Sequence, residues 1–237
     1  MAVQILLVQH SDADPPGRVG EWLTAAGCHL STVRCHLGEP LPTTLAGFEG
    51  LVVLGGEMGA YDDATTPWLA ATKALLARAA AQDLPTLAIC LGHQLLAVAT
   101  GGRVETAPAP QTGIKPVLVT SEAHQDPLFA DLPAAPAAVH WNNDLVVTAP
   151  PGSVVLSHSD ATVQAVRLGS SVWGVQFHPE VDAETVAGWA AEDVAAGRQD
   201  ADVVRAQVDQ IASVDEELQA IWGGFTTRFA RWVLERG

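Results

Sequence analysis

The sequence predicts an α/β fold with three layers, in which a mostly parallel central sheet is flanked by helices. From residue 3 to residue 100, short apolar runs of strand length alternate with longer segments of helical periodicity. Short runs of strand length then continue to residue 175, and the last part of the chain contains only helical patterns. Parallel strands need crossover helices, so a sheet of this kind is covered on both faces.

The first hundred residues contain the elements of the parallel part. We expect strands at 3–8, 29–33, 51–54 and 85–89, and helices at 18–26, 67–81 and 92–100. Gly27 closes the first helix, and Gly101 with Gly102 closes the third. The second helix has Pro67 near its first position, and Thr66 before it is the candidate cap.

Between residues 115 and 175 the pattern changes to short strands. We expect them at 117–120, 137–140, 154–156, 164–167 and 172–175. Most of them are predicted to extend the sheet in antiparallel orientation. The Pro-rich segments 107–110 and 132–136 are predicted to be loops.

Three helices are expected after residue 182, at 183–196, 201–212 and 214–235. The last has an apolar stripe of Leu218, Ile221, Trp222, Phe225, Phe229, Trp232 and Val233. The stripe favours packing against the sheet, and a surface for a partner or a second copy is the alternative. We therefore predict one domain over residues 1–181, with a C-terminal helical extension over 182–237 packed on it.

The charge balance argues against two classes of partner. The chain has 12 Lys and Arg against 27 Asp and Glu, a formal net charge of −15, and no basic cluster. Nucleic acid and anionic membrane are therefore poor candidates. No apolar run reaches 18 residues and no basic leader precedes the first strand, so a cytoplasmic protein is expected.

The cysteines suggest neither disulfides nor a metal site. Three cysteines form no even framework, as expected in a reducing compartment. Two Cys-His pairs, at 28–29 and 35–36, have spacings unlike those of structural zinc ligands. We predict no metal and no cofactor.

Cys90 falls at the expected turn between the strand 85–89 and the helix 92–100. A thiol there is presented at the carboxyl end of a sheet, and the helix N-terminus favours its thiolate form. Small residues are expected two positions to either side of such a crowded turn, and Ala88 and Gly92 occupy them. Alone, this pattern fits a nucleophile or an inert buried cysteine equally well.

His178-Pro179-Glu180 favours the nucleophile. In an extended segment, residues i and i+2 project to the same side, so His178 and Glu180 can act as a base and the group that orients it. Pro179 stiffens the backbone between them. The segment follows the apolar run 172–175, so it lies at a strand end, where active-site residues often occur.

Three ordered motifs resemble those of the class I glutamine amidotransferases of the Cys-His-Glu type. They are the cysteine turn at 87–94, GVQFHPE at 174–180 and the glycine-rich segment VLGGEMGAYDD at 53–63. The resemblance covers most of residues 1–181. It implies a flavodoxin-like fold in which Cys90 attacks the amide of glutamine or a related γ-glutamyl compound. It also implies that His178 moves the proton and that Glu180 orients the imidazole.

The resemblance assigns further residues to the site. The backbone amides of Gly56 and Leu91 are the expected oxyanion hole. The expected substrate contacts are Gln94, Asn142, Asn143 and Asp144. The sequence departs from the family pattern at Asn142 and Asn143, where relatives carry His-Gly, and at Glu57, where a proline is usual.

Three functions are compatible with these motifs. The first is a stand-alone hydrolase of glutamine or of γ-glutamyl amides or peptides, favoured because the chain ends soon after the glutaminase region and has no ATP-using synthetase motif. The second is a glutaminase subunit that delivers ammonia to a separate synthase. The third is a non-enzymatic regulatory or binding module. A small-molecule substrate is the expected partner, a synthase is a possible one, and no oligomeric state is predicted.

Overall fold

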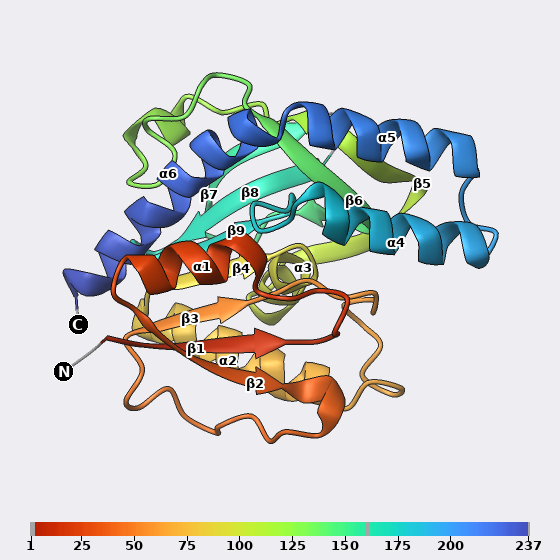
Figure 1. The fold of residues 1–237 in the computed structure, drawn as a ribbon. Coiled ribbons are helices and arrows are strands. Elements are labelled where there is room, and N and C mark those ends of the chain that lie inside the picture. The colour runs from red at the N-terminus through yellow and green to blue at the C-terminus, as the bar shows by residue number, and fades with distance from the viewer. Residues whose placement is uncertain (1–2, 160–161, 237) are drawn as a thin grey trace.

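The computed structural model describes residues 3–159 and 162–236, and its centre is a seven-stranded sheet (Figure 1). The strand order is β2-β1-β3-β4-β9-β8-β7. Their bounds are β1 Gln4–Gln9, β2 His29–Arg34, β3 Gly50–Val53, β4 Thr86–Ile89, β7 Val154–Ser159, β8 Thr162–Leu168 and β9 Val172–Val175. β2, β1, β3, β4 and β9 run parallel, whereas β8 pairs antiparallel with both of its neighbours, β9 and β7. The predicted three-layer α/β fold with a mostly parallel sheet is confirmed.

Helices cover both faces of this sheet. α1 (Gly17–Ala25) and α6 (Asp215–Leu234) lie on one face, and α2 (Trp68–Gln82) and α3 (Leu91–Ala99) on the other (Figure 1). Alternate residues of β1 supply the two cores, since Ile5 and Leu7 face α1 and α6 whereas Leu6 and Val8 face α2 and α3. Burial on both sides explains why the central strands β1, β3, β4 and β9 are almost continuously apolar.

α6 packs its apolar stripe against the sheet. Trp222, Phe225 and Phe229 are fully buried, and the Trp222 Nε1 atom donates a 3.0 Å hydrogen bond to the Ala137 carbonyl. Burying aromatic side chains of this size contributes about 1.5–3 kcal/mol each. The element that follows the site motifs in sequence is therefore part of the same core.

A separate two-stranded sheet corrects two of the predictions. β5 (Arg103–Pro116) and β6 (Ala137–Thr148) pair only with each other, so the antiparallel extension of the main sheet consists of β7 and β8 alone. The Pro-rich segment 107–110 lies inside β5 rather than in a loop. A register shift between Thr106 and Gln111 leaves it without ladder partners, which is where a strand tolerates proline.

Two smaller predictions are also wrong. Residues 117–120 form no strand and make only an isolated bridge, from Val119 to Ser157. Thr66 does not cap α2, because Pro67 occupies the N-cap position and no side chain accepts a bond there. The Thr66 amide donates instead to the Asp62 carbonyl at 2.8 Å, in a turn that precedes the helix.

α4 (Ala183–Ala195) and α5 (Ala201–Ser213) pack on each other, and α5 also contacts β5 (Figure 1). Aspartates cap both helices: Asp182 accepts from the Thr185 amide, and Asp200 from the amides of Asp202 and Val203. Short 3₁₀ segments occur at Cys35–Leu37 and Glu122–Gln125. In the described ranges, no helix has the length and apolar character needed to cross a bilayer.

Candidate active site

Cys90 lies in a strained turn between β4 and α3. Its backbone has φ 50° and ψ −106°, and only one other described non-glycine residue, Asp83, has a positive φ. Such a conformation costs about 1–3 kcal/mol and persists only when its surroundings enforce it. The Cys90 amide donates to the Val175 carbonyl at 2.8 Å, which ties the turn to β9.

Gly92 explains why the turn needs small neighbours. A Cβ atom at this position would lie 2.4 Å from the Val53 carbonyl oxygen, a backbone atom of β3. The close approach of α3 to β3 therefore requires a glycine. It places Cys90 at the carboxyl end of the parallel strands, the edge where ligands bind in α/β folds.

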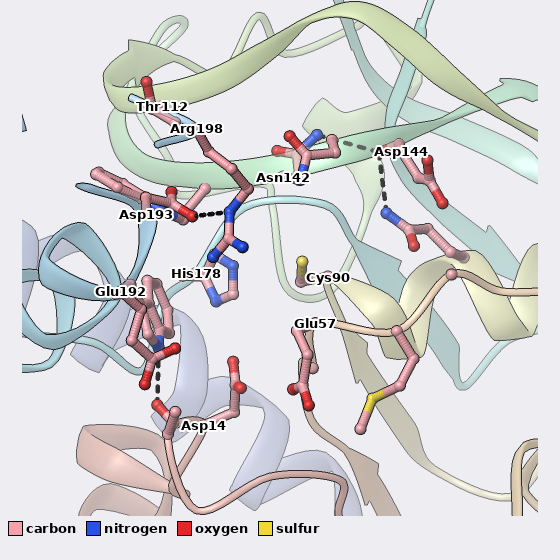
Figure 2. Close-up of a pocket in the computed structure, with 18 of the residues that line it drawn as sticks. Asp14, Glu57, Cys90, Thr112, Asn142, Asp144, His178, Glu192, Asp193 and Arg198 are labelled. Atoms are coloured by element: carbon pink, nitrogen blue, oxygen red, sulfur yellow. Dashed lines mark hydrogen bonds and ion pairs between the residues drawn. The ribbon is translucent and has the colours of Figure 1, made fainter. Parts of the chain in front are cut away.

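His178 and Glu180 form a buried pair next to Cys90. The His178 Nδ1 atom lies 2.6 Å from Glu180 Oε1, and both residues are 3% exposed. The His178 amide donates to the Val139 carbonyl of β6 at 2.9 Å, which fixes the extended backbone. Figure 2 shows the Cys90 sulfur beside the imidazole, whose Nε2 atom has no hydrogen-bond partner of good geometry among the described residues.

The electrostatics of this pair favour a protonated imidazole. Burial alone would lower the pKa of His178, but the Glu180 carboxylate and the Cys90 sulfur outweigh it and hold the His178 pKa well above its ordinary value. An imidazolium beside a sulfur stabilises the thiolate, which is the nucleophilic form of cysteine. A protonated His178, held by Glu180, therefore lies next to the Cys90 sulfur before substrate binds.

Distant segments hold His178 in place. The Trp189 ring of α4 packs against the imidazole with 4.7 Å between ring centroids, and its Nε1 atom donates to the Ala13 carbonyl at 2.8 Å. On the other side, the Glu180 carbonyl accepts from the Arg18 amide at 2.9 Å. Gly17, with φ +45°, permits that approach, because a Cβ there would lie 2.3 Å from the Glu180 oxygen.

A chain of amide side chains also reaches the nucleophile. Gln176 Nε2 donates to Cys90 Sγ at 3.6 Å, and Gln176 Oε1 accepts from Gln94 Nε2 at 3.3 Å. The same Gln94 nitrogen donates to the Asp144 carbonyl at 2.9 Å. Gln94 therefore links the segment 142–144 to the nucleophile, and Gln176 is a residue of the site that the sequence analysis did not single out.

Two backbone amides near Cys90 are unoccupied donors. A Cβ on Gly56 would lie 3.0 Å from Leu91 Cδ2, so these two residues are neighbours. Among the described residues, neither the Gly56 nor the Leu91 amide donates a hydrogen bond to the protein. Free N–H groups beside a nucleophile at a helix start can receive an oxyanion.

Cys90 and His178 line a cavity of about 690 Å³ (Figure 2). Of the residues predicted to contact substrate or oxyanion, the following line it too: Gly56, Gln94, Asn142, Asn143 and Asp144. Asn142 Nδ2 donates to the Asp144 carbonyl at 3.1 Å, and its Oδ1 atom is buried without a partner. Leu91 and Glu180 do not line the cavity, and Glu180 reaches it only through His178.

The opposite side of the cavity is acidic. The side chains of Asp14, Glu57 and Glu192 converge there (Figure 2). Burial raises the pKa of the Asp14 carboxyl to about 6; His178 opposes this shift, whereas Glu180 and Glu57 add to it. Of these three, the sequence analysis noted only Glu57, as a departure from a family pattern.

Arg198 is the one arginine or lysine on the cavity wall in the described ranges, and it is already paired. Its Nε atom lies 2.7 Å from Asp193 Oδ1, and the other Asp193 oxygen accepts from Trp141 Nε1 at 2.9 Å. Gln199 donates to that second oxygen as well, at 2.8 Å. The charge of Arg198 is therefore largely compensated, and this part of the wall is held by a network around Asp193.

Two histidines near the turn at Cys90, His10 and His93, lie outside the cavity wall. His10 is fully buried, and its Nδ1 atom accepts from Trp68 Nε1 at 3.1 Å. Burial, with repulsion from His36, lowers the pKa of His10 to about 4. His93 is equally buried and packs against Gly174, where a Cβ would lie 2.5 Å from its Nδ1 atom. Both side chains are neutral parts of the core.

Comparison with known proteins agrees with this geometry. The family model described as glutamine amidotransferase class-I matches residues 21–188. The glutamine amidotransferase-like protein YfeJ of Salmonella typhimurium is 28% identical over 78% of this chain and 79% of its own length. One subunit of the glutamine-hydrolysing GMP synthase of Ignicoccus hospitalis is 41% identical, over 41% of this chain and 51% of its own. A glutamine amidotransferase of Thermotoga maritima, 22% identical, shares the fold with a TM-score of 0.85 over 97% of this chain and 99% of its own.

Proposed function

The chain belongs to the class-I glutamine amidotransferases, and we propose that it is a self-sufficient amidohydrolase that cleaves glutamine or a γ-glutamyl amide through a γ-glutamyl thioester on Cys90. One observation carries the proposal: a strained cysteine lies beside a buried His178–Glu180 pair on the wall of a 690 Å³ cavity. Cavities of this size accommodate ligands larger than a single amino acid. The cavity therefore has room for a γ-glutamyl amide with an organic amine as well as for glutamine.

In the first half of the proposed reaction, the Cys90 thiolate attacks the γ-carbonyl carbon. An S–C bond forms, and the negative charge on the carbonyl oxygen is received by the amides of Gly56 and Leu91. The loss of one such donor typically costs about 3 kcal/mol in the transition state. His178 gives its Nε2 proton to the leaving nitrogen, the C–N bond breaks, and ammonia or an amine departs.

In the second half, water attacks the thioester. His178 takes a proton from the water, the new C–O bond forms, and the S–C bond breaks to release glutamate. Cys90 leaves as the thiolate and the imidazole is again protonated, so the resting ion pair is restored. Glu180 keeps Nδ1 protonated throughout and stays ionised.

The test is release of ammonia and amines by the purified chain alone, with L-glutamine and a panel of γ-glutamyl amides and peptides. Cys90→Ser should abolish turnover while circular dichroism shows a folded protein. His178→Asn should prevent the thioester from accumulating, as judged by mass spectrometry after exposure to a glutamine-like electrophile. Full activity of Cys90→Ser would refute the nucleophile, and unchanged labelling of Cys90 in His178→Asn would refute the base.

A second candidate function is a glutaminase subunit that supplies ammonia to a separate synthase. The similarity to the GMP synthase subunit of Ignicoccus hospitalis favours it, although the chain spans only about half the length of that relative. Such a subunit should be nearly idle until its synthase binds. Turnover by the isolated chain distinguishes the two, because only the self-sufficient hydrolase would cleave substrate alone.

A further inference from the structure

We propose that the amine released by this site is a cation, so that the preferred substrate is the γ-glutamyl amide of a diamine or polyamine. The inference rests on the proposed function, because it assigns one part of the cavity to the leaving amine. It arises from the contrast between the two sides of the cavity. One side is lined by side-chain amides with a single carboxylate, Asp144, whereas Asp14, Glu57 and Glu192 converge on the other (Figure 2).

The position of His178 determines where the leaving amine lies. The leaving nitrogen must lie next to His178 Nε2, which protonates it. The glutamyl part then extends towards the amide side, where Gln94 and Asn142 surround the Asp144 carbonyl. The amine substituent must leave the reaction centre by the other side, past the edge of the imidazole.

Asp14 lies at that edge. A Cβ atom added to Gly55 would lie 3.1 Å from Asp14 Oδ1, 3.2 Å from His178 Cε1 and 3.6 Å from Cys90 Cβ. The Asp14 carboxyl is therefore a close neighbour of both catalytic side chains. It lines the cavity, points into it, and is accompanied there by the more exposed Glu57 and Glu192 (Figure 2).

The Asp14 carboxyl is stabilised by the Ser11 hydroxyl and by the charge of His178, but among the described residues it forms no ion pair. Asp14 is only 8% exposed, yet no cationic side chain within residues 3–159 and 162–236 comes within 4.0 Å of its carboxyl. Burying a carboxylate without a cation is unfavourable, and buried charges in proteins are normally paired. Two other carboxylates of the cavity do have partners: Asp193 pairs with Arg198, and Asp62 accepts from the Gly59 amide at 2.7 Å.

A ligand with a distal ammonium group would supply the direct ion pair that Asp14 lacks. Its amide nitrogen would meet His178, and its ammonium would reach Asp14, Glu57 and Glu192. A carboxylate in the same place would be repelled by all three. The net charge of −15 would also concentrate cationic substrates near the molecule.

The experiment compares four substrates with the wild-type chain. Three are γ-glutamyl amides of similar length, made from 1,4-diaminobutane, n-pentylamine and 4-aminobutanoate, and the fourth is L-glutamine. The distal group is thus an ammonium, a methyl or a carboxylate. We expect kcat/KM to be about five- to tenfold higher for the ammonium than for the methyl, and lowest for the carboxylate. Equal values, or a preference for the carboxylate, would overturn the inference.

Charge-removing variants test the assignment to these residues. Glu57→Gln and Asp14→Asn should each reduce the ratio of ammonium to methyl kcat/KM, and the double variant should bring it close to one. Glu217→Gln removes one charge from the exposed face of α6 and should leave the ratio unchanged. If Asp14→Asn fails to fold, Glu57→Gln still decides, because Glu57 is exposed. An unaltered ratio in both variants would refute the acidic side as the amine site.

The outcome separates the inference from the function on which it rests. Cys90-dependent turnover of all four substrates without a charge preference would leave the hydrolase proposal intact and refute the cationic amine. No turnover of any substrate and no Cys90 thioester would refute both.

Discussion

The turn at Cys90 and the wall formed by α4 and the segment after it contribute to the same cavity but are built differently. The turn is fixed by backbone contacts, with Gly92 against the Val53 carbonyl and the Cys90 amide bonded to Val175. The wall is held by side chains from distant segments, such as Trp141 on Asp193. In α4 a Cβ added at Gly188 would meet nothing within 4 Å. Cys90 is thus placed by close backbone contacts, whereas the wall depends on contacts between side chains.

The largest effect should come from Gly92→Ala. Its Cβ would lie 2.4 Å from a backbone oxygen, so β3 or α3 must shift. We expect the free energy of unfolding to fall by about 3 kcal/mol or more. Turnover should be lost as Cys90 moves. Denaturant titration and the rate of Cys90 alkylation measure the two effects. Wild-type stability with wild-type alkylation would show that backbone packing does not fix the turn.

The next largest change in stability should come from removing the charge of Asp14, on the acidic side of the cavity. Its pKa in the fold is about 6 against an ordinary 3.8, so the folded state binds the proton more tightly than the unfolded state. The contribution of Asp14 to the free energy of unfolding is therefore most favourable below pH 3.8 and is lost as the pH rises through about 6. Asp14→Asn carries no such penalty, so it should be more stable than the wild type by roughly 1–3 kcal/mol at pH 7.5 and nearly equal to it at pH 4.

Urea titrations of both proteins at the two pH values test this, with the exposed Asp202→Asn as control. A variant that is less stable than the wild type at pH 7.5 would show that the Asp14 charge is satisfied in the free protein. The expected result would mean that the site retains a destabilising charge, as functional sites often do.

The sequence predicted the turn much better than the wall. The residues of the turn are close together in the sequence, whereas those of the wall are far apart. Gly92 and Cys90 are two residues apart, and His178 and Glu180 are joined by one residue, so local patterns identify them. Continuous apolar strands and the stripe of α6 likewise mark the central sheet. The strand β5 (Arg103–Pro116) was missed along its whole length, because its sequence is largely polar and its prolines lie in a bulge that only the pairing with β6 reveals.

The acidic side had no comparable local signal. Asp14 lies in a loop after β1 and Glu192 in α4, and their convergence depends on contacts such as that of Trp189 with Ala13. Gln176 was quoted within a motif, but its bond to Cys90 depends on the parallel pairing of β4 with β9. Side chains that meet only in the folded state cannot be assigned from spacing.

A smaller effect should follow from removing the Gln176 amide, which connects the turn to the substrate side. Gln176→Met keeps the length of the side chain and loses the bonds to Cys90 Sγ and Gln94. We expect kcat/KM and the rate of Cys90 alkylation at pH 7 each to fall about tenfold, or about 1.4 kcal/mol, since a bond to a charged group contributes on this scale. Gln219→Met on α6 is the control. Reduced stability with unchanged alkylation would make Gln176 a packing residue only.

The smallest effect should come from Gly188→Ala, the counterpart in α4 of the change at Gly92. The added methyl group meets no atom within 4 Å, and alanine is the better helix former by about 1 kcal/mol. We expect a gain in stability of up to that amount, with kcat/KM for every substrate unchanged. Replacing glycine by alanine would then lower the free energy of unfolding strongly in the turn and raise it slightly in the wall. A loss of stability at Gly188 comparable to that at Gly92 would instead show that α4 is packed as tightly as the catalytic turn, and that the wall is not the more adaptable region.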